Sequence, residues 1–208
     1  MRDILERDRR RDRRRITNPD LLKRICEFLA DNVGSSNSVN SIAGAINSEG
    51  MKVANSTVDA YIGALVEAYL FYPVRRYDIK GKELLKTLGK HYVADTGIRS
   101  YLEGYRGADP GRVLENIVFL QLRYGGFEVS VGKLRGGEVD FVARKDDSTT
   151  YIQVSEDITD PGTLERELAP LRIIHDAFPK MVVVGKGDYP TNIDGIRIVN
   201  AIDFLLGR

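Results

Sequence analysis

The spacing of apolar residues in the first half of the chain predicts three short helices. Asn18 and Pro19 form a favourable helix start, and apolar residues then recur at intervals of three and four. Stripes of the same period predict a second helix after Ser38 and a third that begins near Asn55 and ends before Pro73. The residues of these stripes are Leu22, Ile25, Cys26, Leu29, Val39, Ile42, Ala43, Ile46, Val58, Ile62, Leu65, Val66 and Tyr69.

Two β-like segments, 71–78 and 90–94, follow these helices and enclose a basic loop over 79–89. Three short helices and then a hairpin form the plan of a winged helix-turn-helix. In this interpretation the third helix is the recognition helix and the loop is the wing. We therefore expect a winged-helix domain over 16–94.

The second half of the chain predicts an α/β domain over 108–208, joined to the first by a turn-rich connector over 95–107. The expected helices cover 111–124, 162–178 and 200–206, and the expected strands cover 127–131, 137–144, 150–155, 181–185 and 195–199. Three successive strands and a crossover helix into a continuous apolar strand indicate a mixed sheet with helices on both faces. The fold class is therefore α/β with mixed α+β character.

Composition and charge narrow the function classes. The 208 residues carry 31 Lys and Arg and 30 Asp and Glu, a net charge of +1, so no global field attracts nucleic acid. Residues 2–15 hold eight Arg and four acids, which makes an Arg-rich helical arm over 1–15, while the remainder holds 23 basic and 26 acidic residues. Contact with nucleic acid must therefore depend on local basic patches.

A cytoplasmic protein without a membrane segment is expected. The chain has one Cys, which fits a reducing compartment, and it lacks an apolar run of about 18 residues. Its Arg-rich start is unlike a secretory signal. Cys26 has no partner nearby in the sequence, and His91 and His175 fall in different halves, so neither a zinc site nor a Cys/His pair is supported.

The basic residues of the first half surround the wing and not the third helix. Residues 56–70 contain no Lys or Arg and include Asp59 and Glu67, which is unfavourable for reading base edges. Contact with the nucleic-acid backbone through the wing and a purely protein-packing role both remain open. The residues that would make the backbone contact are Arg75, Arg76, Lys80, Lys82 and Lys86.

Three polar residues occur where the apolar pattern does not expect them. Glu115 is the only charged residue in 113–122, while Asp140 and Gln153 interrupt neighbouring apolar strands. Burial of a carboxylate is costly unless it is paired or used. Two carboxylates and an amide oxygen at one sheet edge are suitable ligands for Mg²⁺, so Glu115 and Asp140 are the candidate metal ligands.

This order of residues resembles the restriction-endonuclease-like fold of the PD-(D/E)XK superfamily. The resemblance assigns Glu115 to the helix acid, Asp140 to the strand Asp, and Gln153-Val154-Ser155 to the (D/E)-x-Lys element. Gln153 is neutral, and Ser155 replaces the Lys that usually orients or activates water. The resemblance therefore implies a degenerate catalytic site formed by Glu115, Asp140, Gln153 and Ser155.

Several longer segments are similar to the C-terminal half of a bacterial and archaeal AAA-type ATPase family whose last domain is DUF4143. They include STVDAYIGALVEAYLFYPVRRYD, ENIVFLQLRYGGFEVSVGK, EVDFVARK and YIQVS. The resemblance implies an N-terminal ATPase module as partner, with a winged helix and a nuclease-like domain after it. The chain has no G-x-x-x-x-G-K-[ST] loop, so ATP would bind only to that missing module. The resemblance also assigns the Arg-rich arm to the connection with it.

Three functional hypotheses follow. The first is a catalytically degenerate accessory module of an AAA-type ATPase that docks a protein or contacts nucleic acid. The second is a Mg²⁺-dependent nuclease in which Glu115, Asp140 and Gln153 hold the ion. The third is a winged-helix regulator that binds DNA.

Overall fold

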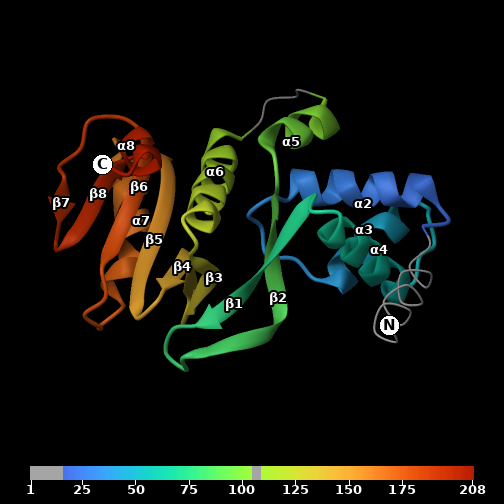
Figure 1. Cartoon of the computed structure of the whole chain (residues 1–208), viewed down its shortest axis with the longest axis horizontal. Helices are drawn as coiled ribbons and strands as arrows, with labels where there is room; N and C mark the ends of the chain where they lie inside the picture. Colours follow the sequence, from blue (N-terminus) through green and yellow to red (C-terminus); the bar gives the residue numbers. More distant parts are fainter. Residues whose placement is uncertain (1–15, 105–108) are drawn as a thin grey trace, which may run out of the picture.

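The computed structural model describes residues 16–104 and 109–208, which fold into a mixed α/β structure around one eight-stranded sheet (Figure 1). The predicted Arg-rich arm lies outside the described residues. The described helices are α2 (Pro19–Asp31), α3 (Val39–Ser48), α4 (Asn55–Glu67), α5 (Thr96–Glu103), α6 (Pro110–Tyr124), α7 (Pro161–Arg172) and α8 (Ala201–Leu206). The strands are β1 (Phe71–Asp78), β2 (Glu83–Val93), β3 (Glu128–Leu134), β4 (Gly137–Lys145), β5 (Ser148–Asp157), β6 (Lys180–Lys186), β7 (Asn192–Ile193) and β8 (Ile196–Asn200).

Local capping explains where several helices begin. The Asn18 side chain accepts a hydrogen bond from the Leu21 N–H at 3.0 Å, and Pro19 occupies the first turn of α2. Asp109 caps α6 in the same way, and α3 opens with a reciprocal capping box between Ser38 and Ser41. These caps confirm the starts that the sequence predicts for α2 and α3.

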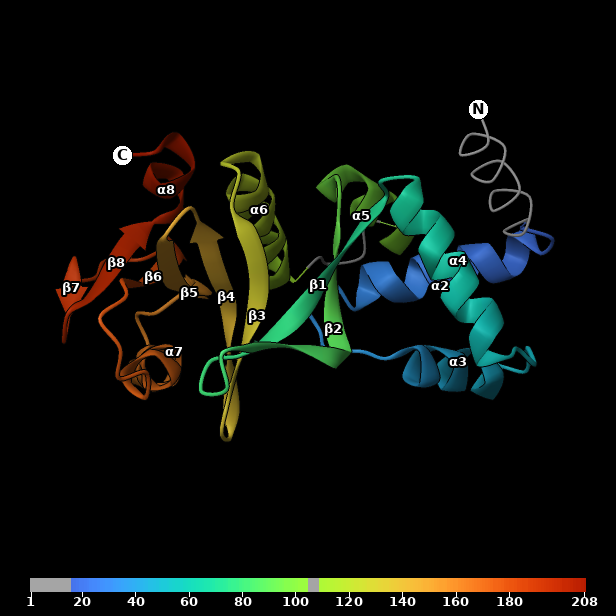
Figure 2. The same ribbon diagram turned by 60° about the horizontal axis from the view of Figure 1, so that its bottom comes forward.

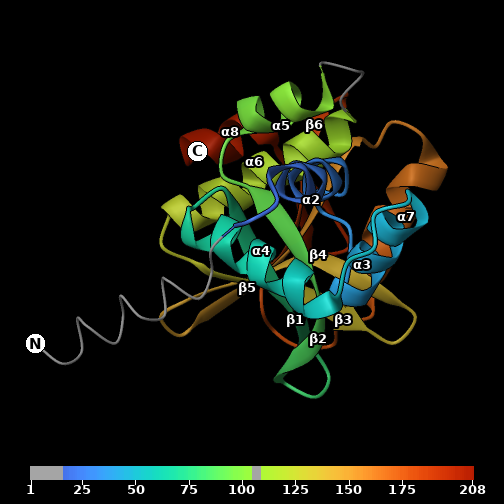
Figure 3. The ribbon, with the colours of Figure 1, turned by 90° about the vertical axis from the view of Figure 1, so that its right-hand side faces the viewer.

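The sheet is continuous through both halves of the chain, in the order β2-β1-β3-β4-β5-β6-β8-β7. Its link is a parallel pairing of β1 with β3, in which Arg76 lies opposite Val131 and Asp78 opposite Lys133. Helices α2 to α4 gather at one end of the molecule, and β6 to β8 lie at the other (Figure 1). Seen from the helical end, α2, α3 and α4 lie in front of the sheet (Figure 3). The division into two domains stays a prediction, but the strands do not stop at the predicted boundary.

The second half places helices on both faces of the sheet, as predicted. Helices α6 and α8 contact each other and cover one face, while α7 covers the opposite face (Figure 2). Residues of β4 alternate accordingly, because Phe141 and Ala143 belong to the core under α6 and Val142 belongs to the core under α7. The first of these cores extends without a break into α2, α3 and α4.

Two predicted boundaries are wrong. Strand β2 begins at Glu83, so the hairpin loop is shorter than the predicted wing of 79–89. The strand pattern is obscured by a register shift opposite Arg75–Tyr77 and by a positive φ of 57° at Leu88. Helix α7 ends at Arg172 instead of residue 178. The chain then leads back to the sheet, where the Tyr151 N–H donates to the carbonyl of Pro179.

The elements of the second half follow the predicted order with one addition. The short strand β7 was not expected, while the predicted order of the other elements in the second half is confirmed. Among the described residues, no helix combines the length and the apolar character needed to cross a membrane.

Candidate functional site

A pocket of about 390 Å³ opens where the N-terminal half of α6 meets β4, β5 and α7. It contains the polar residues that the sequence predicts to converge, but β4 and β5 are the central strands of the sheet, so the predicted location at a sheet edge is wrong. Its lining residues are Asp109, Gly111, Arg112, Glu115, Glu138, Asp140, Gln153, Val154, Arg166, Glu167 and Pro170. The structure therefore brings together Glu115, Asp140 and Gln153, which are 38 residues apart in the sequence at most.

The centre of this cluster is the ammonium group of Lys90, which reaches it from β2. The Lys90 side chain is only 3% exposed, and its Nζ lies 3.2 Å from Glu115 Oε1, 3.0 Å from Glu138 Oε1 and 3.6 Å from Asp140 Oδ1. Burial lowers the pKa of Lys90, but the carboxylates more than offset this effect, so that its pKa is raised. Lys90 is therefore a buried, charged group that neutralises part of the acid cluster.

Glu115 is fixed by two donors from the same strand. Its Oε1 accepts hydrogen bonds from Lys90 Nζ and, at 2.5 Å, from the hydroxyl of Tyr92. Burial, followed by the charge of Glu115, raises the pKa of Tyr92, so the hydroxyl remains a donor. Gly34 lies against the other oxygen, because a Cβ atom added there would be 2.8 Å from Glu115 Oε2.

Asp140 and Gln153 are tied to each other across β4 and β5. The Asp140 N–H donates to Gln153 Oε1 at 3.1 Å, and the Val154 N–H donates to Asp140 Oδ2 at 3.0 Å. The amide nitrogen of Gln153 donates in turn to Glu167 Oε2 at 3.1 Å. Burial, and next the charge of Glu115, raises the pKa of Asp140 to about 7, although Lys90 opposes the shift.

The arrangement does not fit a divalent metal ion. The amide oxygen of Gln153 and one oxygen of Asp140 accept backbone hydrogen bonds, and the remaining acids converge on Lys90. Ligand oxygens bind Mg²⁺ at about 2.0–2.1 Å, but the ammonium already occupies the point that they share. Within residues 16–104 and 109–208, no group of three or more His, Cys, Asp or Glu is arranged to hold a metal ion.

The predicted fourth member of the site is placed differently. Ser155 is buried, and its hydroxyl donates to the carbonyl of Asp157 at 3.2 Å instead of lining the pocket. The positive charge that Ser155 lacks is supplied by Lys90 from another strand. Lys90 is not among the site residues that the sequence predicts. A usable signal was its position two residues before the core residue Tyr92, which puts both side chains on one face of β2.

The basic residues that the sequence assigns to nucleic-acid contact do not line this pocket. Arg75, Lys80 and Lys82 are exposed, whereas Arg76 is partly buried. The side chain of Lys86 lies outside the described residues. Asp78 shapes the hairpin tip, because its Oδ1 accepts from the N–H groups of Lys80 and Gly81.

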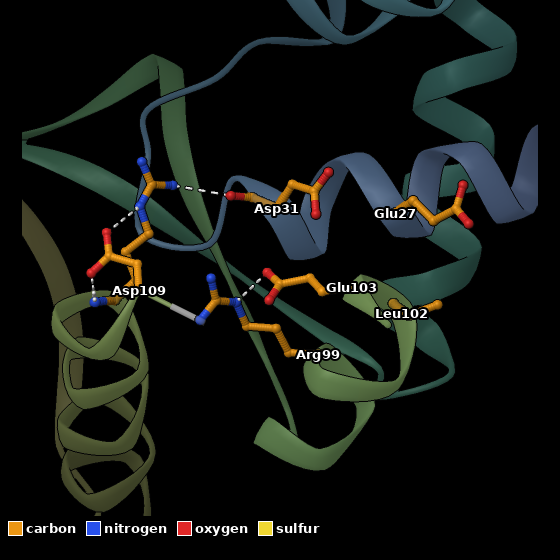
Figure 4. A pocket seen from close by; sticks show the side chains of 7 residues that line it. Glu27, Asp31, Arg99, Leu102, Glu103 and Asp109 are labelled. Atoms are coloured by element: carbon orange, nitrogen blue, oxygen red, sulfur yellow. Dashed lines mark hydrogen bonds and ion pairs between the residues drawn. The ribbon is translucent and has the colours of Figure 1, made fainter. Parts of the chain in front are cut away.

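A second cavity, of about 550 Å³, lies between α2, α5 and the start of α6 (Figure 4). Its guanidinium groups link elements to one another. Arg99 Nε lies 2.8 Å from Glu103 Oε1 and donates to the carbonyl of Ala30 at 3.2 Å. Arg112 donates to the carbonyl of Asp31 at 3.1 Å. These contacts join α2, α5 and α6, whereas the buried Nη1 of Arg99 has no hydrogen-bond partner among the described residues.

Comparison with known proteins gives one family match. The family model described as "Domain of unknown function (DUF8612)" matches residues 1–109. An uncharacterized protein of Haemophilus influenzae is 39% identical over 191 residues, which make up 92% of this chain and 47% of that protein. The uncharacterized protein MJ1544 of Methanocaldococcus jannaschii is 28% identical over 145 residues, covering 68% of this chain and 31% of that protein.

The chain thus spans less than half the length of these two curated relatives. Among solved structures, protein VC1899 from Vibrio cholerae is similar with a TM-score of 0.35 and 13% identity, over 90% of this chain and 55% of that chain. The resemblance to AAA-type ATPases with a DUF4143 domain stays a prediction.

Proposed function

This chain belongs to the DUF8612 family, whose description names no function, and we propose that it is an accessory module. In this proposal the chain contacts nucleic acid next to a nuclease-type acid cluster but does not cut the nucleic acid. The observation that carries the proposal is the position of Lys90. Its ammonium lies within 3.6 Å of oxygens from Glu115, Glu138 and Asp140. The acids that would hold a catalytic ion are thereby engaged by a side chain of the protein itself.

The order of elements supports the finer fold behind this proposal. Helix α6, strands β3 to β5, helix α7 and strand β6 follow the α-β-β-β-α-β order that the restriction-endonuclease-like resemblance implies. Helices α2 to α4 and the β1–β2 hairpin follow the order of a winged helix. We interpret the chain as these two units joined through one sheet.

The register of the sheet supports nucleic-acid contact next to the acid cluster. Asp78 at the hairpin tip lies opposite Lys133, and Lys133 lies opposite Glu138 of the cluster. Exposed Lys80 and Lys82 are thus carried on a tip close to the pocket. Helix α4 contains no Lys or Arg, so the contact would be with phosphates and would weaken with salt.

A metal-dependent nuclease is the second candidate, and one observation favours it. Lys90 brings to Glu115 and Asp140 the ammonium that is missing at Ser155. A nuclease of this type would need the acids to release Lys90 before they bound an ion. For that reason we rank it second.

The proposed partner is an ATPase module in a longer protein. The curated relatives extend well beyond the matched region, so each has room for a further module. ATP binding would belong to that module. Pull-down of this chain by the remaining part of the Haemophilus influenzae relative would support the pairing, and failure of the two parts to associate would contradict it.

The main test measures binding and cutting separately. Labelled duplex DNA is titrated at low and high salt with the wild type and with Lys80→Glu/Lys82→Glu. The matched control is Arg197→Glu/Arg208→Glu, which makes the same charge change at exposed residues of β8 and the C-terminus. We expect the hairpin variant alone to lose roughly tenfold or more in affinity at low salt, because each phosphate contact adds to a salt-dependent term.

Cutting is assayed with plasmid DNA and RNA in the presence of Mg²⁺ or Mn²⁺. We expect no cleavage beyond that of an Asp140→Ala preparation. Metal-dependent cleavage that disappears in Asp140→Ala would overturn the proposal in favour of the nuclease. Equal affinity of the wild type and the hairpin variant would contradict nucleic-acid contact by the hairpin.

A further inference from the structure

We infer that the cavity between α2, α5 and the start of α6 is a binding site for a basic peptide segment. A Lys or Arg side chain of the segment pairs with acids of α2, and a main-chain carbonyl of the same segment accepts from Arg99. The inference does not depend on the proposed contact with nucleic acid, because the lining residues come from α2, α5 and the start of α6 and not from the hairpin.

The first observation is a buried donor without an acceptor. The Arg99 side chain is only 4% exposed, and its Nε contacts Glu103 and the carbonyl of Ala30. Its Nη1 is buried and has no hydrogen-bond partner among the described residues. Figure 4 shows the Arg99 guanidinium directed into the space between Asp31 and Asp109. Since buried polar groups in folded proteins are nearly always paired, this nitrogen indicates an acceptor oxygen on a ligand.

The second observation is the sign of the charge around this donor. The cavity is lined by four acids and two arginines, so an anionic ligand such as phosphate would meet a net negative wall. Glu103 and Asp109 are each paired with one of the arginines. The remaining acids, Glu27 and Asp31, lie in the last two turns of α2, where the negative end of the helix dipole also attracts cations. The acceptor oxygen therefore belongs to a ligand that also carries a positive charge.

A basic residue within a peptide meets both requirements. A simple diamine has the charge but lacks an acceptor for Arg99, whereas a Lys or Arg residue in a peptide has a cationic side chain and a main-chain carbonyl. Leu102 supplies an apolar wall for the methylene groups of such a side chain. The volume of about 550 Å³ lies within the range of about 300–1,000 Å³ that is usual for small-ligand sites.

The walls of the site are held in place by the protein itself. Arg99 donates to the carbonyl of Ala30 at 3.2 Å, and Arg112 donates to the carbonyl of Asp31 at 3.1 Å. Helices α5 and α6 are thereby both fixed to the end of α2. A ligand consequently meets a preformed cavity, which lowers the cost of binding.

The test uses the full chain and three matched probes. Acetyl-Ala-Arg-Ala-amide carries the charge and the carbonyls, acetyl-Ala-Gln-Ala-amide carries the carbonyls alone, and agmatine carries the charge alone. Binding is followed by NMR titration of the amide signals of Asp31, Glu103 and Arg112. We expect the Arg peptide to bind about fivefold more tightly than the Gln peptide, from ion pairs, and about tenfold more tightly than agmatine, from one charge-assisted hydrogen bond.

Two variants identify the groups that hold the peptide. Glu27→Gln/Asp31→Asn should weaken binding of the Arg peptide and of agmatine about fivefold. Arg99→Lys keeps the charge but removes Nη1, so it should weaken binding of the Arg peptide about tenfold and leave agmatine unchanged. The matched control, Asp146→Asn/Asp147→Asn in the exposed β4–β5 turn, should leave both affinities unchanged.

Several outcomes would overturn the inference. They are equal affinity of the Arg peptide and either other probe, and unchanged binding after neutralisation of Glu27 and Asp31. Inorganic phosphate that shifts the same amide signals would also overturn it, because the cavity would then be an anion site. If Arg99→Lys does not fold, the comparison of probes in the wild type still decides among these outcomes.

The basic segment has two possible sources, a partner protein and residues 2–15 of this chain, which hold eight Arg. The variant Arg13→Gln/Arg14→Gln/Arg15→Gln distinguishes them. Tighter binding of the Arg peptide to this variant than to the wild type would identify the chain's own segment as a competitor, whereas equal affinity would assign the site to a partner protein. Absence of binding to both proteins would overturn the inference and would leave DNA binding by the hairpin untouched.

Discussion

At the scale of single residues, the balance of charge around Asp140 decides how stability depends on pH. The pKa of Asp140 in the folded protein is raised to about 7, chiefly by burial and next by the charge of Glu115. The folded state therefore holds a proton between about pH 4 and pH 7 that the unfolded chain has already released. The bound proton stabilises the folded state most at about pH 4, and this stabilisation is lost as the pH rises through about 7.

We expect the wild type to lose stability relative to Asp140→Asn as the pH rises from about 4 to about 7. The slope is at most about 1.4 kcal/mol per pH unit, the value for one proton. Urea unfolding at several pH values gives the free energy of unfolding and therefore this slope. The control is Asp147→Asn in the exposed β4–β5 turn. Parallel curves for the wild type and Asp140→Asn would contradict the expected proton uptake.

A glycine supports the acid cluster from outside. Gly34 has a positive φ of 74°, and an added Cβ would lie 2.8 Å from Glu115 Oε2. Gly34→Ala should destabilise the protein by about 1–2 kcal/mol, from backbone strain and displacement of Glu115. Gly44→Ala, within α3 and with open space around the added atom, should be neutral or stabilising. Equal effects of both changes on chemical unfolding would show that Gly34 is not constrained.

At the scale of elements, β2 joins an aromatic core to the acid cluster. Tyr92 stacks on Phe119 of α6 with ring centroids 4.4 Å apart, while its hydroxyl reaches Glu115. The ring packs as part of the core and the hydroxyl makes a polar contact. A substitution that removes only the oxygen therefore separates the two roles.

Tyr92→Phe should cost about 1.5–3 kcal/mol, the range for a hydrogen bond to a charged group, because it leaves a buried acceptor with one donor fewer. The matched control is Tyr72→Phe in β1, whose ring also contacts Phe119, at 5.8 Å. Equilibrium denaturation of the wild type and of each variant gives the change in the free energy of unfolding for Tyr92→Phe and for Tyr72→Phe. A cost below about 0.5 kcal/mol at Tyr92 would mean that the Glu115 contact adds little to stability.

The elements also show how far sequence reasoning reaches. Apolar periodicity and capping residues predicted most helices and strands, because these signals are local. The start of β2 was missed because an irregular register and the positive φ at Leu88 break the alternation. The convergence of Glu115, Asp140 and Gln153 was predictable, since their strands and helix are neighbours in the chain. The contribution of Lys90 was not, because it depends on how β2 lies against α6.

At the scale of the whole molecule, the two halves share one sheet and one continuous core. Asn116 of α6 makes a further link, because its side chain both accepts from and donates to the backbone of Val93, at 2.9 and 3.0 Å. These contacts bind the predicted winged-helix region to the second half. Because of these contacts, unfolding of one half would disrupt the packing of the other half.

We therefore expect a single cooperative unfolding transition for the whole chain. Far-ultraviolet and near-ultraviolet circular dichroism should give coincident curves during thermal unfolding. Asn116→Ala should shift both curves together to lower temperature, since it leaves buried backbone groups without partners. Two separate transitions, or a shift of only one signal, would show that the halves unfold separately.

The origin of Lys90 in β2 has a consequence for protein engineering. A chimera that kept α6 to α8 and took its helices and hairpin from another protein would inherit three acids without their counterion. In the sequence, the connector between α5 and α6 looks like a natural crossover point. Recombination there would nevertheless produce a domain whose acidic charges are not neutralised. A donor segment has to include β1 and β2 to transfer the cluster intact.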